Sequence, residues 1–574
     1  MKTYNELKKN IKKFRDTPEK ERISLAVLGD SATQFLANAI RGMGYEHQIR
    51  AEVYDAEYDS IETSIFDEAS ELYQEERDFV VLYFSVERAY EEYQRTPENT
   101  RQDFAEQYLD RILSCWDGLK RNTRAVILQF NFNRMDEGVL GNYALREPSS
   151  FSYQLFKLNY LLAEKASQAQ SVFLIDLDMI QAEYGKREFS DRKYYYQARM
   201  SLGFEAVVRS TEEIYDVIFA VRGRIRKCLI LDLDNTLWGG IVGEDGLNGI
   251  EIGELGAGRA FSDLQRWCLE LKKRGILLAV CSKNDEDQAK EPFEKHPDMI
   301  LHLDDFAVFV ANWEDKASNI RWIQSVLNIG FDSMVFLDDN PYERNLVREL
   351  IPEVTVPELP EDPAEYLSFL QPLHLFETAS FALKGADRTG LYHAEAKRRE
   401  AESASVSIEE YLQSLEMTAE AKPFDAFHYP RIAELSQRSN QFNLRTVRYL
   451  EDEIRHLAED EGYLTRYFML RDRFGDYGLI SAVILKKLEG GRAFIDTWFM
   501  SCRVLKRGME EYIMNEIVSL CRKEGIGQII GEYLRTSKND MVSGLYDRLG
   551  FTNEGEGRYL LEVKDYRPFP TFIH

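Results

Sequence analysis

Two aspartates at the end of an apolar run are the clearest chemical signal in the sequence. The stretch Leu229-Ile-Leu-Asp-Leu-Asp-Asn-Thr-Leu-Trp-Gly-Gly240 places Asp232 and Asp234 two residues apart, just before a glycine-containing turn. Alternate residues of a strand point to the same side, and open α/β sheets build their sites at the carboxyl ends of the strands. One carboxylate could attack an electrophile while the other moves a proton, and the pair could help to hold Mg²⁺. A pair of acids by itself could also simply end a strand. Polar residues elsewhere in the chain therefore decide whether this pair belongs to a chemical site.

Such partners follow the other apolar runs of the same region. Ser282 ends the run that starts at Gly275, Lys316 follows Ala311, and Asp338 and Asp339 follow the run from Met334. Strands and helices alternate over about residues 225–375, which predicts a doubly wound parallel sheet whose strand ends meet at one edge. Phosphoryl transfer needs positive charge that offsets the repulsion between a carboxylate and a phosphate. The pattern therefore predicts a phosphoryl-transfer site.

Length, composition and charge limit the class of protein. A chain of 574 residues is expected to form about three to five domains, and its 44% hydrophobic residues are enough for buried cores. The net charge of −26 argues against binding of nucleic acid or of an anionic membrane. We find no apolar run of ~18 residues and no signal peptide at the charged amino terminus. Six scattered cysteines without zinc spacing favour a reduced, cytoplasmic protein.

The first region, residues 1–215, also alternates apolar runs with helical stretches, which predicts a parallel α/β sheet. Its first run ends in Gly29-Asp30-Ser31. This block resembles the SGNH (GDSL-type) hydrolases, and the resemblance implies that Ser31 is a nucleophile in an SGNH-like, flavodoxin-like domain. The family's closing Asp-x-x-His block is missing, and a serine without a histidine base is poorly activated. We therefore expect this domain to be degenerate.

The second region, residues 220–375, is similar to the haloacid dehalogenase (HAD) superfamily. Its Asp-x-Asp-x-Thr motif matches Asp232, Asp234 and Thr236. The resemblance implies a Rossmann-like parallel sheet in which Asp232 is the nucleophile and Asp234 the general acid/base. It also implies that Ser282 hydrogen-bonds the transferring phosphoryl group, that Lys316 neutralises charge on that group and on Asp232, and that Thr236 is a catalytic residue of the motif.

The same resemblance implies a Mg²⁺ site. Its ligands would be Asp232, the backbone carbonyl of Asp234, and Asp338 or Asp339. Neighbouring residues on a strand point opposite ways, so the choice between Asp338 and Asp339 stays open. The short interval between Asp232 and Ser282 leaves room for a glycine-containing flap and one helix, so no large cap domain is expected.

Longer motifs narrow the resemblance to the FkbH-like branch, HAD subfamily IIIC. They are the continuation of the Asp-x-Asp motif to Gly246, the block Phe336-Leu-Asp-Asp-Asn-Pro-Tyr-Glu-Arg344, and Val356-Pro-Glu-Leu-Pro-Glu-Asp-Pro363. Members are associated with removing phosphate from 1,3-bisphosphoglycerate and placing the glyceryl group on the phosphopantetheine thiol of an acyl carrier protein. The resemblance thus implies two partners, a phosphorylated acyl donor and a carrier protein.

The last region, residues 405–574, follows a helical connector at 376–404 and resembles GNAT acyltransferases of mixed α/β fold. The family's loop for the phosphates of coenzyme A or phosphopantetheine corresponds to Arg503-Val-Leu-Lys-Arg-Gly508, although Lys506 stands where a glycine is expected. Cys502 beside Arg503 would have a lowered pKa, which makes it a candidate acyl-carrying thiol, although it could also be packed at a strand end. The resemblance implies the following phosphopantetheine-binding residues: Arg503, Val504, Lys506, Arg507, Gly508 and Tyr546.

We therefore predict a multidomain α/β enzyme with an SGNH-like, a HAD-like and a GNAT-like domain. Its predicted function is Mg²⁺-dependent phosphoryl removal from an acyl phosphate, coupled to acyl transfer to a carrier thiol. Two alternatives stay open: a phosphatase whose flanking domains do not react, and a non-catalytic assembly protein. The acyl group and the cognate carrier are not specified by the sequence.

Overall fold

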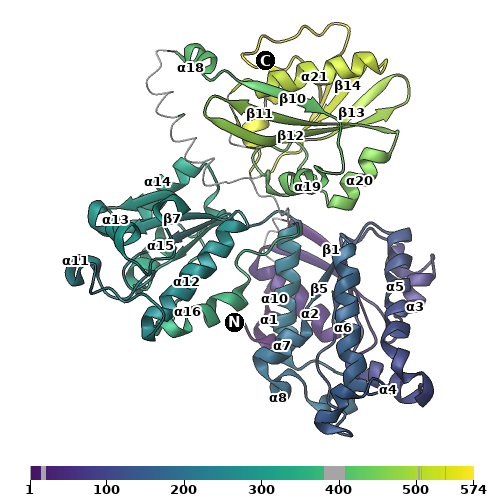
Figure 1. Ribbon diagram of the computed structural model, residues 1–574. Helices are drawn as coiled ribbons and strands as arrows, with labels where there is room; N and C mark the ends of the chain where they lie inside the picture. Colours follow the sequence, from purple (N-terminus) through teal and green to yellow (C-terminus); the bar gives the residue numbers. More distant parts are fainter. Residues whose placement is uncertain are drawn as a thin grey trace. The chain divides into compact units, whose positions relative to one another are not determined.

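The computed structural model describes residues 2–13, 21–380, 398, 407–501, 504–505, 507–536 and 538–574. The chain divides into two compact units, Met1–Ile218 and Phe219–His574. The first unit contains one parallel sheet, and the second contains a parallel sheet and a mixed sheet (Figure 1). The predicted multidomain α/β class is thereby confirmed. The predicted boundaries within the second unit stay a prediction, because most of the connector 376–404 lies outside the described residues.

The sheet of the first unit has five parallel strands in the order β2-β1-β3-β4-β5. Every residue of β3 and β4 is buried, as expected for central strands covered by helices on both faces. The strands are β1 (Glu21–Gly29), β2 (Ile49–Asp55), β3 (Phe79–Tyr83), β4 (Val126–Phe130) and β5 (Val172–Ile175). The helices are α1 (Tyr4–Lys13), α2 (Gln34–Glu46), α3 (Ile61–Phe66), α4 (Val86–Arg95), α5 (Phe104–Asn122), α6 (Phe151–Gln168), α7 (Leu177–Tyr184), α8 (Lys186–Phe189), α9 (Arg192–Ala198) and α10 (Phe204–Val221).

The parallel sheet of the second unit has four strands in the order β8-β7-β6-β9. The strand that carries the Asp-x-Asp motif, β6, therefore lies between its two chemical partners, β7 and β9. The strands are β6 (Cys228–Leu231), β7 (Leu277–Ser282), β8 (Phe306–Ala311) and β9 (Met334–Leu337). The helices are α11 (Val242–Asp245), α12 (Gly256–Lys273), α13 (Glu286–Lys295), α14 (Lys316–Leu327), α15 (Pro341–Leu350) and α16 (Tyr366–Leu370).

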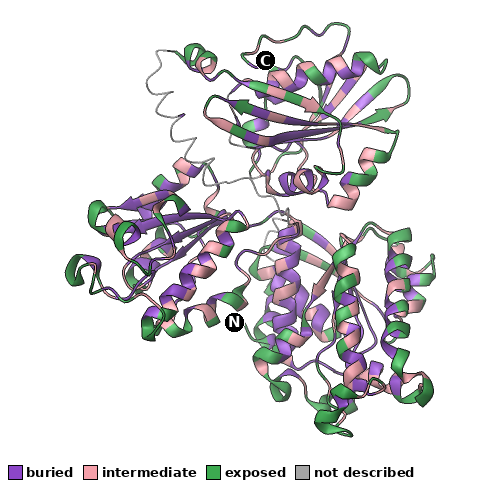
Figure 2. Cartoon of the chain, in the orientation of Figure 1, coloured by how far each residue is buried: buried purple, intermediate pink, exposed green. Residues whose placement is uncertain are grey.

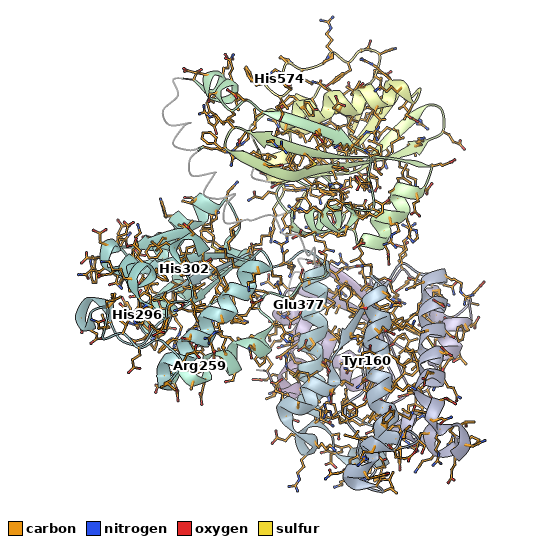
Figure 3. The ribbon with its side chains drawn as sticks, viewed as in Figure 1. Tyr160, Arg259, His296, His302, Glu377 and His574 are labelled. Atoms are coloured by element: carbon orange, nitrogen blue, oxygen red, sulfur yellow. The ribbon has the colours of Figure 1, made fainter. Side chains whose placement is uncertain are left out.

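Both faces of this four-stranded sheet are packed. Leu229 and Leu231 of β6 belong to one hydrophobic cluster, and Cys228 and Ile230 belong to another. The buried strands are coloured accordingly in Figure 2. Helix α12 turns its polar side to solvent, where Arg259, labelled in Figure 3, pairs with Asp263 one turn further on. Two-sided burial leaves only the edges of the sheet for a polar site.

The sheet at the carboxyl end of the chain has seven strands in the order β10-β11-β12-β13-β14-β16-β15. Among the strands of the described residues, β13 and β14 are the pair that runs parallel in this sheet, so the sheet is mixed, as predicted. The strands are β10 (Thr418–Lys422), β11 (Tyr463–Asp472), β12 (Gly475–Leu488), β13 (Arg492–Met500), β14 (Gln528–Glu532), β15 (Thr552–Gly555) and β16 (Arg558–Glu562). The helices are α18 (Ile408–Ser414), α19 (Tyr429–Arg438), α20 (Glu451–Glu459), α21 (Met509–Lys523) and α22 (Leu545–Arg548).

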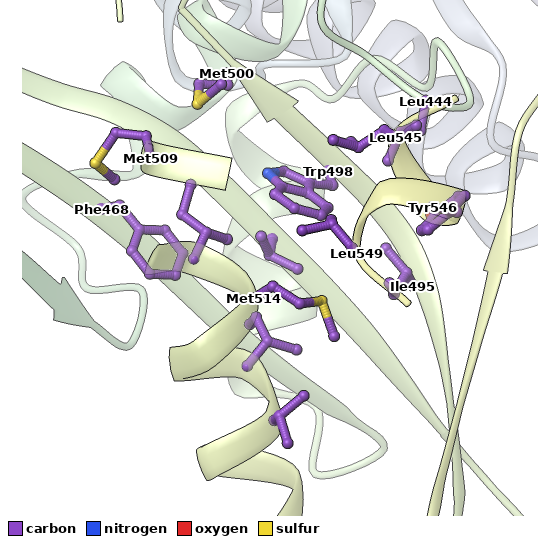
Figure 4. Packing of buried hydrophobic residues seen from close by; sticks show 14 of the residues in the cluster. Leu444, Phe468, Ile495, Trp498, Met500, Met509, Met514, Leu545, Tyr546 and Leu549 are labelled. Carbon is purple, nitrogen blue, oxygen red and sulfur yellow. The ribbon is translucent and has the colours of Figure 1, made fainter. Parts of the chain in front are cut away.

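Helix α21 packs its apolar side on this mixed sheet. Met514 of α21 and Trp498 of β13 belong to one buried cluster, which also includes Tyr546 and Leu549 (Figure 4). Among the helices of the described residues, none combines a bilayer-spanning length with sufficient hydropathy.

Candidate active site

Four polar segments meet at the carboxyl edge of the four-stranded sheet. Asp232 follows β6, Ser282 ends β7, and Asp338 follows β9. Lys316 is the first residue of α14, which follows β8, and the Asp315 side chain caps this helix by accepting the N–H of Ser318 at 2.8 Å. The fold thus brings together residues that are up to about 105 positions apart in the sequence.

The ammonium group of Lys316 lies between two of these carboxylates. Its Nζ is 2.9 Å from Asp232 Oδ2 and also pairs with Asp338 Oδ2. All three side chains are buried. Burial by itself lowers the pKa of Lys316, but the charges of Asp232 and Asp338 outweigh it and raise the pKa above its ordinary value. Lys316 is therefore a fixed positive charge next to Asp232, as the sequence predicted.

Two buried oxygens in this cluster have no hydrogen-bond partner among the described residues. They are Asp232 Oδ1 and Ser282 Oγ, which come from the adjacent strands β6 and β7. Buried polar atoms are nearly always paired, and leaving one unpaired costs ~1–3 kcal/mol. Unpaired atoms on the predicted nucleophile and the predicted phosphoryl-binding residue are what a site prepared for a ligand would show.

Three carboxylates form a group suited to a divalent cation. Asp232, Asp338 and Asp339 each offer one oxygen, and these atoms lie within 4.8 Å of one another. Burial, followed by the charge of Asp232, raises the pKa of Asp338 to about 7 and that of Asp339 to about 6. A bound cation would relieve this repulsion, and Mg²⁺ prefers a few carboxylates with water and phosphate oxygens. The residues therefore fit the predicted Mg²⁺ site.

The structure distinguishes Asp338 from Asp339, although both belong to the group. The carboxylate of Asp338 already pairs with Lys316 and accepts the N–H of Asn340 at 2.8 Å. The carboxylate of Asp339 has no such internal contact among those described, and its backbone N–H donates to Thr236 Oγ1 at 3.2 Å. Thr236, predicted to be catalytic, is fully buried and joins the turn after β6 to the loop after β9.

The Asp234 carboxylate accepts three hydrogen bonds that the sequence motifs do not predict. Its Oδ1 accepts the indole N–H of Trp238 at 2.9 Å and the backbone N–H of Val242 at 3.0 Å. Its Oδ2 accepts the side-chain amide of Asn284 at 2.8 Å. Trp238 and Asn284 lie in recognisable motifs, but no spacing rule indicates that they converge on one carboxylate. The donors fix Asp234 at the site without burying it fully.

Arg344 is a second residue whose role only the structure shows. Its guanidinium donates to the carbonyls of Asp338 and Asp339 at 2.8 and 2.6 Å and pairs with Glu358 at 2.5 Å. It therefore fixes the backbone that carries two of the three clustered carboxylates. Lys283, which follows β7, and Glu343, in the first turn of α15, form a further ion pair at 2.6 Å.

The segment between β6 and β7 contains the flap, α11 and α12, without an inserted cap domain. Gly239 exchanges backbone hydrogen bonds with Glu251, and the Asp245 carboxylate accepts the N–H of Ile241 at 2.8 Å. The backbone φ angle of +85° at Gly240 belongs to the left-handed region that favours glycine. The expected open, capless arrangement is therefore present.

Of the two cysteines considered as acyl-carrying thiols, the structure describes Cys281 and not Cys502. Cys281 is fully buried in the hydrophobic cluster opposite the site, as expected from strand alternation, and burial raises its pKa. The candidate thiol Cys502 lies outside the described residues, as do Arg503 and Lys506. Their predicted roles stay predictions.

The described part of the phosphopantetheine loop differs from expectation at Arg507. Its guanidinium is buried, pairs with Asp472 at 3.6 Å and donates to the hydroxyl of Tyr477, so it points into the protein rather than toward a ligand at the surface. Asp472 also pairs with Arg398 at 2.7 Å. A buried carboxylate attracts a nearby cation more strongly than solvent-exposed phosphate can.

The other described residues of this loop take ordinary structural positions. Val504 is fully buried, and Gly508 has a φ of +78° and directly precedes α21. Tyr546 is buried in the core, with its ring 4.8 Å from Phe551 and 5.0 Å from Tyr559. Contact of these residues with a pantetheine arm stays a prediction.

In the first unit, Ser31 lies at the carboxyl end of β1 and is buried. The only histidine in the sequence of this unit is His47. It precedes β2, at the opposite edge of the parallel sheet, and stacks on Tyr215. Ser31 therefore has no histidine base within the first unit, in agreement with the degenerate block in the sequence.

Asp30, next to Ser31, provides a pH-dependent prediction. Burial raises its pKa to about 7, although its Oδ1 accepts the N–H of Ser85 at 2.8 Å. Because the pKa is higher in the folded state than in the unfolded state, stability should fall as pH rises from about 4 to about 7, by roughly 2–4 kcal/mol. Asp30→Asn should remove this dependence.

Hydrogen exchange of β1 and β3 at several pH values, taken as the difference between Asp30→Asn and the wild-type protein, measures the effect. The difference cancels the intrinsic pH dependence of exchange. The exposed Asp110→Asn change on α5 is the matched control. An equal slope in the wild-type and Asp30→Asn proteins would contradict the prediction.

The chain is similar to one family model and to several solved structures. A family model described as FkbH, N-terminal domain, matches residues 24–219. No protein among those with curated functions matches the sequence. The crystal structure of the N-terminal part of protein BF1531 from Bacteroides fragilis, which contains a phosphatase domain and is complexed with Mg, is 45% identical. The similarity covers 66% of this chain and all of that chain, with a TM-score of 0.63.

Small acetyltransferases match about a quarter of the chain at low identity. The ribosomal-protein-S18-alanine N-acetyltransferase from Escherichia coli is 16% identical over 25% of this chain and 94% of its own, with a TM-score of 0.21. An acetyltransferase of the GNAT family from Staphylococcus aureus is 11% identical over 25% of this chain and 99% of its own, with a TM-score of 0.22.

Proposed function

The chain belongs to the FkbH-like family of the HAD superfamily, and we propose that the cluster around Asp232 transfers a phosphoryl group through an aspartyl-phosphate. The observation that supports this most strongly is the placement of Lys316 between the buried carboxylates of Asp232 and Asp338. It leaves Asp232 Oδ1 unpaired and beside a fixed positive charge. A carboxylate in that setting is able to attack an anionic phosphate.

In the first step, an oxygen of Asp232 attacks phosphorus and the bond to the leaving group breaks. Lys316 neutralises charge on the phosphoryl oxygens, and Ser282 donates its hydroxyl hydrogen to one of them. Asp234 gives a proton to the leaving oxygen. In the second step, Asp234 takes a proton from water, which attacks phosphorus and releases phosphate and the free Asp232 carboxylate. The three donors to Asp234 keep it oriented through both steps.

Asp232, Asp338 and Asp339 would hold Mg²⁺, with the carbonyl of Asp234 as a further ligand. When bound, Mg²⁺ supplies positive charge that offsets repulsion between the carboxylate and the phosphate. The structure of the similar protein from Bacteroides fragilis, which is complexed with Mg, supports this assignment.

We further propose that the natural substrate is an acyl phosphate and that its acyl group passes to a carrier thiol. The family supports this, as does the capless site, which leaves room for a carrier's arm. Phosphoryl transfer to Asp232 and acyl transfer to a thiol break different bonds of an acyl phosphate. Attack by Asp232 on phosphorus leaves a free carboxylate, which no longer reacts with a thiol. For transfer, the thiolate must attack the C1 carbonyl carbon, the carbon–oxygen bond breaks, and the C1 phosphate leaves while the thiol proton goes to solvent. With 1,3-bisphosphoglycerate as donor, the phosphoester on C3 is the group that Asp232 removes through the aspartyl-phosphate, so that a glyceryl group stays on the thiol.

The experiment uses 1,3-bisphosphoglycerate labelled with oxygen-18 at the bridging acyl oxygen. The full chain, Mg²⁺ and a phosphopantetheinylated carrier protein are incubated with it, and the same carrier without its arm is the control. Transfer predicts a glyceryl mass on the armed carrier only, with the label in the released phosphate. Label that remains in the free acid, 3-phosphoglycerate or glycerate, with no mass on the carrier, would overturn the transfer proposal.

Two other functions remain as outcomes of the same experiment. Phosphate release that does not depend on the carrier, with label in glycerate, indicates a phosphatase whose flanking domains do not react. The absence of both Mg²⁺ binding and turnover, on this donor and on a panel of phosphoesters, indicates a non-catalytic assembly protein.

A further inference from the structure

The second unit contains a cavity that is separate from the Asp232 cluster. Its volume is about 360 Å³, and all of its lining residues belong to the second unit. One wall comes from the amino edge of the four-stranded sheet, where Lys227 precedes β6, Leu277 begins β7 and Ser333 precedes β9. The Asp232 cluster lies at the carboxyl edge of the same sheet, so the two sites share no residue. The proposed chemistry therefore leaves this cavity unused.

The cavity is lined mainly by positive charge, although the chain as a whole is acidic. Arg431 and Arg438 lie seven positions apart on α19, so they belong to one face of the helix. Lys227 and Lys538 also line the cavity, and Asp332 is the one acid among its described lining residues. In the whole sequence, acids outnumber bases by 98 to 72. The reversed balance around the cavity indicates a site for an anion.

The charges of the two arginines of α19 are only partly neutralised by their neighbours. Both side chains pair with Glu434, at 2.5 Å from Nη1 of Arg431 and at 3.1 Å from Nε of Arg438. Lys538, in contrast, has a carboxylate of its own in Asp332. One carboxylate shared by two guanidinium groups leaves an excess of positive charge on the face of α19 that lines the cavity.

Both guanidinium groups keep donors that no described residue uses. A guanidinium group has five N–H donors. Nη2 of Arg431 and both Nη groups of Arg438 donate to no described residue, and these nitrogens retain accessible surface. The two side chains are 23% and 14% exposed. Accessible donors in the wall of the cavity are therefore left for a ligand.

The donors favour a phosphate among the possible anions. Arginine binds phosphate oxygens through two parallel N–H groups, and a phosphate has enough oxygens for two guanidinium groups. Arg507, which the sequence predicts to bind a phosphate, is turned inward to Asp472. The arginines of α19 thus supply a charge that Arg507 does not.

The remaining lining indicates what the phosphate is attached to. Leu435, Phe442 and Met500 offer apolar surface, and Ser439 and Asn440 offer polar side chains beside Arg438. Small-molecule pockets commonly measure roughly 300–1,000 Å³, so this cavity is at the lower end of the range. It fits a short organic chain rather than a polymer.

We propose that this cavity binds a small organic phosphate, with the phosphate on Arg431 and Arg438 and the carbon chain along Phe442 and Met500. Two molecules of the proposed function share this chemistry, namely the phosphorylated acyl donor and the phosphopantetheine arm of the carrier. The choice of these two candidates rests on the proposed function, whereas the site itself rests on the residues of the cavity. Binding here is independent of phosphoryl transfer to Asp232.

Arg438→Gln in the full-length chain tests the proposal, with Arg455→Gln as the matched control. Arg455 is an exposed arginine of α20 that pairs with the glutamate four positions earlier, as Arg438 does, and it does not line the cavity. Calorimetry measures the binding of 3-phosphoglycerate, phosphopantetheine and inorganic phosphate, with glycerate and pantetheine as phosphate-free comparisons. EDTA is present, so that Mg²⁺-dependent turnover does not consume the ligands.

We expect one of the two organic phosphates to bind saturably, at least about tenfold more tightly than its phosphate-free form and than inorganic phosphate. Arg438→Gln should weaken this binding by about tenfold or more, and Arg455→Gln should leave it unchanged. The tighter ligand identifies the source, since 3-phosphoglycerate indicates the acyl donor and phosphopantetheine indicates the carrier's arm. Arg431→Gln repeats the test at a second position, and circular dichroism verifies that each variant is folded.

Three results would overturn the proposal. They are the absence of saturable binding of both organic phosphates, equally tight binding of inorganic phosphate or of the phosphate-free forms, and binding that is unchanged in both arginine variants. None of these results depends on turnover. A failure of the phosphoryl-transfer proposal would instead appear as a wild-type protein that binds the ligand but releases no phosphate when Mg²⁺ is supplied.

Discussion

Asp232→Asn is expected to lower phosphate release in the absence of a carrier by about 10,000-fold or more, because the amide cannot attack phosphorus. The variant should also fail to form an acid-stable phosphoenzyme, which is measured by rapid quench and intact mass. Its fold should be retained, since the change removes one negative charge from a crowded carboxylate group while Lys316 keeps its pair with Asp338. The unfolding temperature without metal is therefore expected to be unchanged or higher.

Asp287→Asn is the matched control for this substitution. Asp287 is an exposed carboxylate in the first turn of α13 and has no part in the cluster. It should retain wild-type phosphate release. Phosphoenzyme formation by the Asp232→Asn protein would show that another residue is the nucleophile.

Lys316→Met should have the second-largest effect, on activity and on stability together. It leaves Asp232 and Asp338 buried side by side without a cation, which should destabilise the metal-free protein by about 3–5 kcal/mol. Phosphate release should fall by about 1,000-fold, since the charge on the phosphoryl group is no longer neutralised. Unfolding in EDTA and in excess Mg²⁺ measures the first effect, and Mg²⁺ should restore part of the lost stability.

The sign of the pH dependence gives an independent check on this variant. Asp338 already has a raised pKa of about 7, and loss of Lys316 should raise it further. Protonation of Asp338 removes the repulsion, so the destabilisation should shrink as pH is lowered from about 8 to about 5. Lys295→Met, at an exposed surface pair with Glu291, should change neither activity nor the pH dependence, because exposed pairs contribute little. A destabilisation that grows toward acid pH would contradict the assigned ion pair.

The sequence by itself determined which residues stand at the ends of the strands in the four-stranded sheet. The apolar runs before Asp232, Ser282 and Asp338 define buried parallel strands, and parallel strands bring their carboxyl ends to one edge whatever the details of packing. The long motifs identified the family from local order alone. Local patterns were sufficient here because each of these features depends only on residues close together in the chain.

The tertiary structure decided which side chains actually meet. It placed Lys316 against both Asp232 and Asp338, directed three donors to Asp234, and turned Arg507 inward to Asp472. It also brought Glu87 and Ser201, which are more than a hundred positions apart in the sequence, to one cavity of the first unit. Periodicity specifies the face on which a side chain lies, but the partner and the degree of burial depend on elements distant in sequence. The charge of each group, and therefore its chemistry, is fixed only by those distant contacts.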